Sequence, residues 1–377
     1  MRIIIPIRRY CNGEAAMNRL IGYAKGFAHF GVDVWIYFFI TNKDEERLLI
    51  ESPYIHIRYL WEKDSKFLKK HRALELAKNM LIFRKEVHKE DFLFLYGRAN
   101  YFLLLAWSLR KRCKVFSEIT EHPDYLGSSF IQRLDIGVSY SFLRSFNGVF
   151  VISNMLRQHF ISCGLEEKRV NVINMFVDPE RFGKSLNTTE AKYVAYCGSV
   201  SKNKDGVDIL IKAFALFRKE FPEYSLYIIG GRGDDEPLEY FQELSCILGI
   251  ENNVVFTGKV PADRMPELLS NASILALSRP DSLQARNGFP TKLGEYLATG
   301  VPVVVTNVGE ITSFIIDGKN GIIAQESSVE DFANKLSWVA SNPQRANEIG
   351  ARGKELVMKE FSNISQSQRA LELMKSL

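Results

Sequence analysis

The sequence predicts an α/β protein built from two doubly wound, Rossmann-like domains. The chain has 377 residues, more than one hydrophobic core of ordinary size needs. Short β-branched runs alternate with longer segments of helical apolar spacing, which is the pattern of strand–helix–strand units in a parallel sheet. This alternation restarts after a polar, turn-rich stretch at residues 184–192, which we take as the interdomain linker.

The first half, residues 1–185, supplies the elements of one such domain. A strand at residues 2–7, a helix at about 14–30 and a strand at 32–39 form the first parallel unit, and Gly31 ends the helix. The other strands predicted in this half lie at residues 55–59, 92–96, 115–118, 148–152 and 170–173.

The second half, residues 190–355, repeats the same order of elements. Its predicted strands lie at residues 193–197, 226–229, 254–256, 273–277, 303–306 and 322–323, and helices are predicted at 206–220 and 328–342. We expect residues 356–377 to form a C-terminal helix that packs back on the N-terminal domain.

The composition is that of an ordinary globular protein, with 46% hydrophobic and 25% charged residues. The five cysteines contain no C-x-x-C pair, so we expect reduced thiols and neither a disulfide framework nor a zinc site. The longest apolar runs are far shorter than the ~20 residues of a transmembrane helix. Met1 leads directly into a predicted strand, so we expect no signal peptide and a cytoplasmic protein.

The net charge of +5 is unevenly distributed along the chain. Residues 1–188 carry 29 Lys/Arg against 20 Asp/Glu, a balance of +9, and residues 189–377 carry 20 against 24, a balance of −4. A basic half suggests an anionic partner, for which nucleic acid, anionic lipid and a phosphorylated acceptor are candidates. No motif that interleaves aromatic and basic residues supports nucleic acid, so we expect no nucleic-acid partner.

A basic helix is predicted at residues 62–85. Its apolar residues at helical spacing are Phe67, Leu74, Ala77 and Leu81. With the basic residues at 110–114, this helix could dock on an anionic membrane surface. A solvated helix on the outside of the domain is the alternative interpretation.

The stretch Asn287-Gly-Phe-Pro-Thr-Lys-Leu-Gly-Glu-Tyr-Leu-Ala-Thr-Gly300 is the most informative motif. Gly288 and Pro290 predict a turn that leads into a helix, and Gly300 ends that helix before a buried strand. The N-terminus of such a helix presents backbone N–H groups that suit a phosphate. Glu295, one turn further, could accept hydrogen bonds from sugar hydroxyls, so the motif predicts a nucleotide-sugar site.

Three further loops follow predicted strands, where open α/β sheets bind ligands. In Gly198-Ser-Val-Ser-Lys-Asn-Lys-Asp-Gly206, Lys202 or Lys204 could neutralise a diphosphate, or both could simply face water. This loop is neither a Walker A loop nor a G-x-G-x-x-G fingerprint. Glycines after residue 229 would let the backbone approach a ligand, or mark a surface loop. Residues 256–260 could form the floor for a base or ribose, or an ordinary turn.

Taken together, these spaced motifs resemble the retaining glycosyltransferases of family 4. The resemblance covers nearly the whole chain. It is carried by Tyr196-Cys-Gly-Ser199 with Lys204, Ile228-Ile-Gly-Gly231, Phe256-Thr-Gly-Lys-Val260, Gly288-Phe-Pro-Thr-Lys-Leu-Gly-Glu-Tyr-Leu-Ala298 and Asp317-Gly-Lys-Asn-Gly321. It implies the GT-B fold, in which two Rossmann-like domains face a central cleft. It also implies transfer of a sugar, with retention, from a UDP-sugar or GDP-sugar to a glycan or lipid-linked acceptor, without a metal or other cofactor.

The resemblance also implies residue roles. Glu295 would bind the ribose, Thr291 would lie near the diphosphate, and Lys204 would bind phosphate. The full set of implied donor-binding residues is Gly13, Gly198, Ser199, Lys202, Lys204, Gly230, Gly231, Lys259, Val260, Asn287, Gly288, Phe289, Pro290, Thr291, Lys292 and Glu295. The implied catalytic residues are Lys204, Glu121, His122 and Asn287. Glu118 is a further candidate to position donor or acceptor.

Two positions depart from the family pattern. Asn287 stands where a glutamate contacts the donor sugar, and Ser199 stands where an arginine accompanies the phosphate-binding lysine. Lys202, Arg279 or Arg286 could replace the missing charge. The departures keep a second hypothesis open, in which the chain is a catalytically silent nucleotide-sugar-binding or scaffold subunit. A nucleotide-sugar epimerase and an inverting transferase are alternatives with the same fold.

Overall fold

The chain folds into two compact units in the computed structural model. The structure describes residues 1–10, 15–42, 47–60, 62–63, 65–97, 100–122, 130–182, 192–231, 233, 236–287 and 289–377, with only the backbone at 41–42, 62–63, 65–72, 130–132, 284 and 287. Unit 1 comprises Met1–Asn174 and Asn363–Leu377, and unit 2 comprises Met175–Ser362. The units thus divide at residues 174/175 and 362/363, whereas the predicted linker falls mostly outside the described residues.

Unit 1 is built on a parallel sheet that has seven strands in the described part of the chain. Their order across the sheet is β4 (Ile55–Tyr59), β2 (Asp33–Phe38), β1 (Arg2–Ile7), β6 (Asp91–Tyr96), β7 (Lys114–Ile119), β8 (Gly148–Val151) and β9 (Val170–Val172). The predicted strands agree with these bounds to within one residue at each end. A short parallel pair, β3 (Thr41–Asn42) and β5 (Glu62–Lys63), was not predicted.

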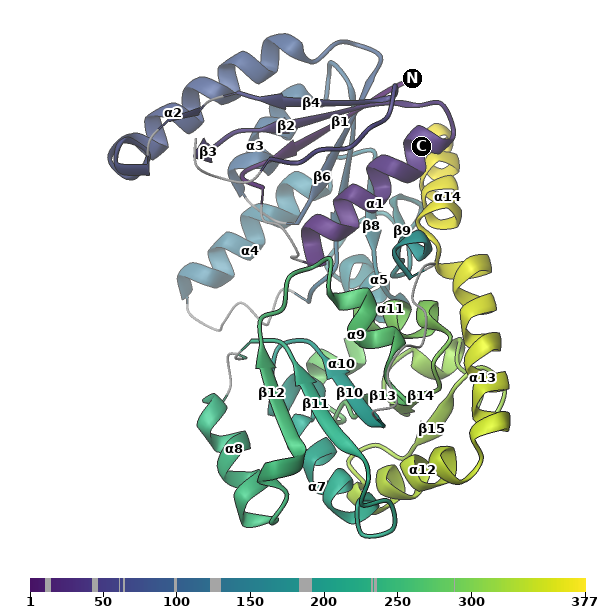
Figure 1. The fold of residues 1–377 in the computed structure, drawn as a ribbon. Helices are drawn as coiled ribbons and strands as arrows, with labels where there is room; N and C mark the ends of the chain where they lie inside the picture. Colours follow the sequence, from purple (N-terminus) through teal and green to yellow (C-terminus); the bar gives the residue numbers. More distant parts are fainter. Residues whose placement is uncertain are drawn as a thin grey trace. The chain divides into compact units, whose positions relative to one another are not determined.

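Helices cover both faces of this sheet, as expected for a doubly wound fold (Figure 1). The chain moves from β1 toward one edge through β2 and β4, then returns to β6 and continues to the other edge. Right-handed crossovers therefore place α1 on the opposite face from the crossover helices α2, α3, α4 and α5. The helices of unit 1 are α1 (Ala15–His29), α2 (Ser65–Glu86), α3 (Asn100–Leu109), α4 (Phe130–Leu143), α5 (Asn154–Ser162), the 3₁₀ turn η2 (Glu167–Arg169) and α14 (Asn363–Ser376).

The C-terminal helix α14 packs on α1 within unit 1 (Figure 1). Gly26 on α1 makes this close approach feasible, because a Cβ atom there would lie 2.2 Å from the Ser367 Oγ. Residues 356–362, which were predicted as part of the same helix, instead belong to unit 2. These residues include a π-helical turn at Val357–Phe361, and α14 begins after them at Asn363.

Unit 2 holds a second parallel sheet, with six strands among the described residues. Their order is β12 (Val254–Gly258), β11 (Ser225–Ile229), β10 (Tyr193–Cys197), β13 (Ile274–Leu277), β14 (Val303–Thr306) and β15 (Ile322–Ala324). The predicted bounds differ by at most two residues. The strand order reverses between β10 and β13, and the carboxyl edge at such a reversal is where open α/β sheets bind ligands.

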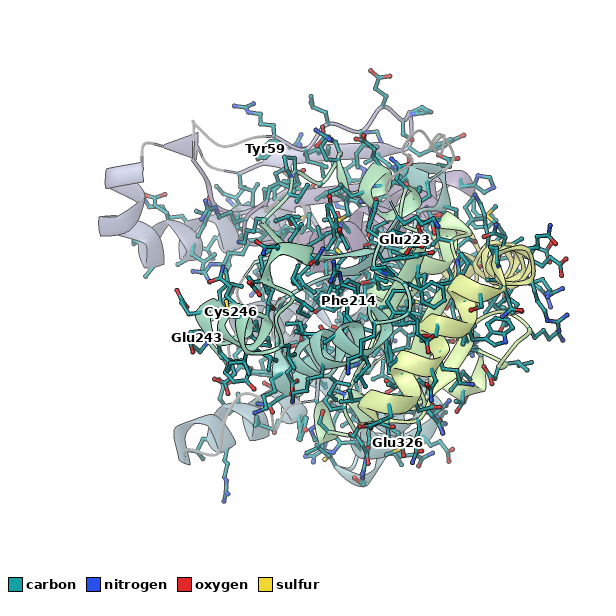
Figure 2. The ribbon with its side chains drawn as sticks, turned by 60° about the horizontal axis from the view of Figure 1, so that its bottom comes forward. Tyr59, Phe214, Glu223, Glu243, Cys246 and Glu326 are labelled. Carbon is teal, nitrogen blue, oxygen red and sulfur yellow. The ribbon has the colours of Figure 1, made fainter. Side chains whose placement is uncertain are left out.

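The sheet of unit 2 is likewise covered by helices. They are α6 (Lys202–Asp205), α7 (Val207–Phe217), α8 (Leu238–Ile247), α9 (Met265–Ser270), α10 (Leu283–Asn287), α11 (Thr291–Thr299), α12 (Val329–Ser341), α13 (Pro343–Leu356), the π turn η6 (Val357–Phe361) and the 3₁₀ turns η3 (Pro179–Phe182), η4 (Glu251–Asn253) and η5 (Ile311–Ser313). Figure 2 shows buried Phe214 of α7 together with Glu243 and Cys246, which α8 exposes. The prediction of a doubly wound α/β chain is therefore confirmed.

Two observations bear on the class of protein. The described cysteines, Cys113, Cys163, Cys197 and Cys246, are free thiols, and Cys11 lies outside the described residues. Across the described ranges, the structure contains no helix with the length and apolar content needed to cross a bilayer.

Candidate active site

The motif at residues 287–300 lies at the carboxyl edge of the sheet in unit 2. As predicted, it forms a helix, α11, which ends at Gly300 in the left-handed conformation (φ 82°). Pro290 is the N-cap residue of α11. A proline side chain cannot accept hydrogen bonds from the first-turn amides, so a ligand can take that place. The side chain of Phe289 is buried against Phe314 and Phe361, directly before Pro290.

A buried polar network joins this helix to the strand ends beside it. Lys292 of α11 forms an ion pair and a hydrogen bond with Asp205 of α6, and its Nζ lies 3.0 Å from the Tyr196 hydroxyl oxygen. The Tyr196 hydroxyl is 2.7 Å from the Asp205 Oδ2 and 2.6 Å from the Ser199 carbonyl oxygen. Arg279 after β13 lies 3.7 Å from the other Asp205 oxygen. The network thus holds together the loops after β10 and β13 and the first turn of α11.

The charges in this network fix the ionisation of its members. Burial raises the pKa of the Asp205 carboxyl, but Lys292 and Arg279 outweigh burial, so this pKa lies below its ordinary value. Burial and the Asp205 charge both raise the pKa of the Tyr196 phenol well above its ordinary value. Asp205 is therefore ionised and Tyr196 neutral, and this one carboxylate faces the two cations Lys292 and Arg279.

Glycines allow the loops after β10 and β11 to approach one another closely. Gly198 (φ 150°) and Gly230 (φ 141°) adopt left-handed conformations that favour glycine. A Cβ atom on Gly230 would lie 2.0 Å from the Gly198 carbonyl oxygen, and one on Gly198 would lie 2.2 Å from the Lys292 Nζ. The two loops and the Lys292 ammonium group are therefore packed without room for side chains at these positions.

Glu295, the predicted ribose ligand, forms an ion pair that the sequence did not predict. The Arg181 guanidinium of η3 donates a hydrogen bond of 2.9 Å to its Oε1. Both side chains stay partly accessible, at 22% for Glu295 and 26% for Arg181. A carboxylate has two acceptor oxygens, so Oε2 remains able to accept from a ribose hydroxyl while Arg181 fixes Oε1.

The remaining predicted donor residues of unit 2 lie on the same strand-end loops. Lys202 and Lys204 are half-buried in α6, with the Lys202 ammonium 5.4 Å from the centre of the Tyr240 ring. Ser199 and Lys259 are exposed, and Val260 is half-buried. A Cβ atom on Gly231 would lie 3.2 Å from Cγ of Lys259.

Of the residues proposed to replace the missing arginine, Arg279 is buried in the network just described. Arg286 is exposed and forms an ion pair with Asp281. Three predicted residues cannot be placed in full. Gly13 and Gly288 lie outside the described residues, and Asn287 is described by its backbone alone, as the last residue of α10.

In unit 1, Glu118 is a structural residue, which corrects its candidacy as a ligand. Its side chain is fully buried and forms an ion pair with Arg19 of α1, with Oε1 2.6 Å from the guanidinium. The Tyr23 hydroxyl donates to the same oxygen at 2.6 Å, and Arg19 also donates to the carbonyl oxygens of Ile173 and Asn174. These contacts occupy the carboxylate and tie α1 to β7 and to the end of β9.

The other two candidates of unit 1, Glu121 and His122, follow β7. Glu121 is exposed, whereas His122 is 7% exposed with its ring centre 4.0 Å from that of His159 on α5. His159 Nε2 lies 2.8 Å from the Tyr140 hydroxyl of α4. His122 is thus part of an imidazole–phenol cluster at the carboxyl edge of the sheet. His159 and Tyr140 were not predicted as members of a site, because neither lies in a recognisable motif.

Models of two glycosyltransferase families match the chain in succession. The model described as "Glycosyltransferase Family 4" matches residues 18–181, and the model described as "Glycosyl transferases group 1" matches residues 177–356. The first match falls almost wholly in unit 1 and the second in unit 2. Together they account for both parallel-sheet units.

Curated relatives match about half of the chain. A GDP-mannose-dependent α-(1-6)-phosphatidylinositol monomannoside mannosyltransferase of Mycolicibacterium smegmatis is 28% identical over 184 residues, which are 48% of this chain and 47% of that protein. A mannosylfructose-phosphate synthase of Agrobacterium fabrum is 29% identical over 183 residues, 45% of this chain and 39% of that protein. The chain therefore spans half or less of the length of these relatives.

Solved structures match the chain over its whole length. Sucrose-phosphate synthase from Thermosynechococcus elongatus superposes with a TM-score of 0.76 at 15% identity, covering 100% of this chain and 98% of that one. HepE from Anabaena, solved with UDP and glucose, gives 0.74 at 17% identity and covers 100% of both chains. At this identity the likeness shows the fold alone, and it agrees with the predicted GT-B fold. The chain belongs to glycosyltransferase family 4 and has the GT-B fold.

Proposed function

We propose that the protein transfers a sugar, with retention, from a nucleoside diphosphate sugar to a glycan or lipid-linked acceptor. The observation that carries this proposal is the arrangement at the carboxyl edge of unit 2. The first turn of α11, the Lys292 ammonium of the buried network and the partly accessible Glu295 carboxylate follow one another there within a few residues. The backbone amides and the cation would bind a diphosphate, and the carboxylate would bind the ribose hydroxyls next to it. This is the order in which a nucleoside diphosphate presents these groups.

Charge is the main physical problem of the proposed reaction. The departing diphosphate gains negative charge while the sugar becomes oxocarbenium-like. Lys204, the α11 N-terminus and the Lys292 ammonium would stabilise the diphosphate electrostatically, which is commonly a large term in catalysis. We propose that this arrangement dispenses with a metal or other cofactor. Retention would follow a same-face route without an enzymic nucleophile, so we assign no catalytic base.

For the residues that handle the sugars, the proposal keeps the roles implied by the sequence. Asn287 would contact the donor sugar, and Glu121 and His122 of unit 1 would position donor or acceptor. Unit 1 would bind the acceptor and unit 2 the donor. The curated relatives include a GDP-mannose-dependent mannosyltransferase, and HepE was solved with UDP, so we propose UDP-sugars and GDP-sugars as the donors to test. A role in cell-surface polysaccharide or glycoconjugate biosynthesis would fit such acceptors.

The proposal predicts that purified protein releases UDP or GDP from a matching nucleotide sugar. The experiment is a coupled assay of nucleotide release with a panel of UDP-, GDP- and ADP-sugars, with and without glycan and lipid-linked acceptors. Nuclear magnetic resonance of the product's anomeric carbon would establish retention or inversion. Tight binding of a nucleotide sugar without turnover on any acceptor would instead favour a nucleotide-sugar-binding or scaffold subunit.

A second part of the proposal places the protein at the cytoplasmic face of a membrane. On α2, Asn79 and Phe83 face inward, and the Asn79 amide donates to the Phe39 carbonyl oxygen at 2.7 Å. The predicted apolar side of α2 therefore faces solvent, with Leu74 58% and Leu81 64% exposed. The side chain of Phe67, which was assigned to that side, is not described.

Basic and aromatic side chains accompany this apolar side. Arg84 of α2 donates a hydrogen bond to the Ser108 hydroxyl of α3, so the two helices lie next to each other. On α3, Trp107 is 37% exposed and the Arg110 guanidinium stacks 4.0 Å from the centre of its ring. Apolar side chains flanked by arginines and an interfacial tryptophan suit an anionic lipid surface.

The membrane proposal predicts that the double variant Leu74→Ser/Leu81→Ser binds anionic vesicles more weakly, by about tenfold or more, because each buried leucine contributes roughly 1.5–3 kcal/mol. The measurement is co-sedimentation with phosphatidylglycerol-containing vesicles, compared with phosphatidylcholine alone. Ile247→Ser on α8 is the matched control, because Ile247 is 81% exposed but lies in unit 2. Equal vesicle binding by the wild type and the double variant would contradict this part.

A further inference from the structure

We propose that Lys292 is a cation that binds the diphosphate of the donor, in addition to Lys204, and that Asp205 and Tyr196 position its ammonium group for this task. The inference rests on the proposed function, because it requires a nucleoside diphosphate as ligand. The family pattern has an arginine where this chain has Ser199. The inference assigns the positive charge of that arginine to Lys292, 93 positions further along the sequence.

The network around Asp205 contains fewer anionic than cationic side chains among the groups described above. One carboxylate faces two cations, Lys292 and Arg279. Asp205 therefore shares one negative charge between two cationic side chains and does not fully neutralise the Lys292 ammonium. A partly buried ammonium group gains from a further counter-charge. An anionic ligand in contact with Lys292 would supply that counter-charge.

The charged side chains of the cluster differ in their access to solvent. The side chains of Arg279 and Asp205 are 3% and 2% exposed, whereas that of Lys292 is 15% exposed. Among these three charged groups, a ligand in solvent can therefore contact Lys292 alone. An ammonium group has three N–H bonds. Asp205 and Tyr196 accept two of them in the described part of the chain, so the third can donate to an anion.

The Lys292 ammonium also lies beside the loop that carries Ser199. The Lys292 ammonium lies against Gly198, directly before Ser199, where the absence of a side chain admits it. The Tyr196 hydroxyl that contacts Lys292 also contacts the Ser199 carbonyl oxygen. Lys292 therefore places its charge beside the loop in which Ser199 provides none. Arg286, the exposed alternative, is engaged with Asp281 instead.

The test compares Lys292→Met with the wild type in binding UDP, GDP, uridine and guanosine by calorimetry. We expect the affinity for the preferred nucleoside diphosphate to fall about 10- to 100-fold, as for a lost hydrogen bond to a charged group. Affinity for the matching nucleoside should not change. Diphosphate binding should also become less sensitive to salt, because one charge contact is lost. An equal loss for nucleoside and diphosphate, or no loss for either, would overturn the inference.

Folding and the proposed function are controlled separately. Asp205 keeps Arg279 and Tyr196 as partners in Lys292→Met; if this variant does not fold, Lys292→Gln, which retains a hydrogen-bond donor without charge, takes its place. Lys335→Met is the matched control. Lys335 also forms an ion pair with an aspartate, Asp317, but it lies on α12 and not on α11. If the wild type binds neither UDP nor GDP, the proposed function fails; if it binds one and Lys292→Met binds it equally, only the inference fails.

Discussion

Replacing Glu295 with alanine is expected to raise the KM for the nucleotide-sugar donor about 10- to 100-fold, with a smaller effect on kcat. The reason is the loss of a charged acceptor for the ribose hydroxyls, since hydrogen bonds to a charged group contribute roughly 1.5–3 kcal/mol. Glu295 is suited to this role because its side chain remains 22% exposed while Arg181 holds one of its oxygens. Steady-state kinetics of nucleotide release, with the donor as varied substrate, measures the effect.

Two controls separate ribose binding from the ion pair itself. Arg181→Met removes the pair but leaves the carboxylate, so we expect it to change the donor KM less than Glu295→Ala does. Glu223→Ala removes an exposed ion pair with Lys192 elsewhere in unit 2 and should leave the kinetics unchanged (Figure 2). If Glu295→Ala left the donor KM at the wild-type value, Glu295 would not be the ribose ligand.

Replacing Glu118 with alanine is expected to destabilise unit 1 by about 3–5 kcal/mol, because it leaves the Arg19 guanidinium buried without its counter-charge. Burial lowers the pKa of Arg19, but Glu118 outweighs burial and raises it above its ordinary value. Arg19 consequently stays charged near neutral pH. Native-state hydrogen exchange of the full chain, read on the amides of α1 and β7, measures the loss without assuming that both units unfold together.

Two further variants test this explanation. The double variant Arg19→Met/Glu118→Leu should recover much of the lost stability, because an apolar pair of similar volume removes both buried charges. Glu167→Ala breaks the ion pair with Arg157, in which Glu167 is 71% exposed, and should have little effect. Protection in Glu118→Ala equal to that of the wild type would show that the buried pair does not stabilise unit 1.

The sequence was sufficient to locate the strands because their residues are buried on both faces. Short, mostly apolar runs at residues 2–7, 193–197 and 303–306 coincide with β1, β10 and β14. The strands β3 and β5 were missed because two residues carry no periodicity. For the same reason, the four residues of α6 were predicted as a loop.

The sequence was also sufficient to predict that α11 begins after Pro290 and ends at Gly300, because local turn chemistry fixes both ends. It was not sufficient for the partners of the charged residues. Glu118 was a candidate ligand in sequence, yet it is the buried partner of Arg19, which lies 99 positions earlier. Lys292 and Asp205 are 87 positions apart, and only the adjacency of β10 and β13 brings their helices together.

By itself, the sequence determined that this protein is a two-unit α/β chain of glycosyltransferase family 4, in which the motif proposed to bind the donor forms a helix that ends at Gly300. These properties depend on local patterns of burial and backbone conformation, which short segments encode. The tertiary structure decided which charged groups are ligand candidates and which are structural. Those roles depend on burial and on the nearest opposite charge, and both are set by the order of strands across a sheet rather than by the order of residues along the chain.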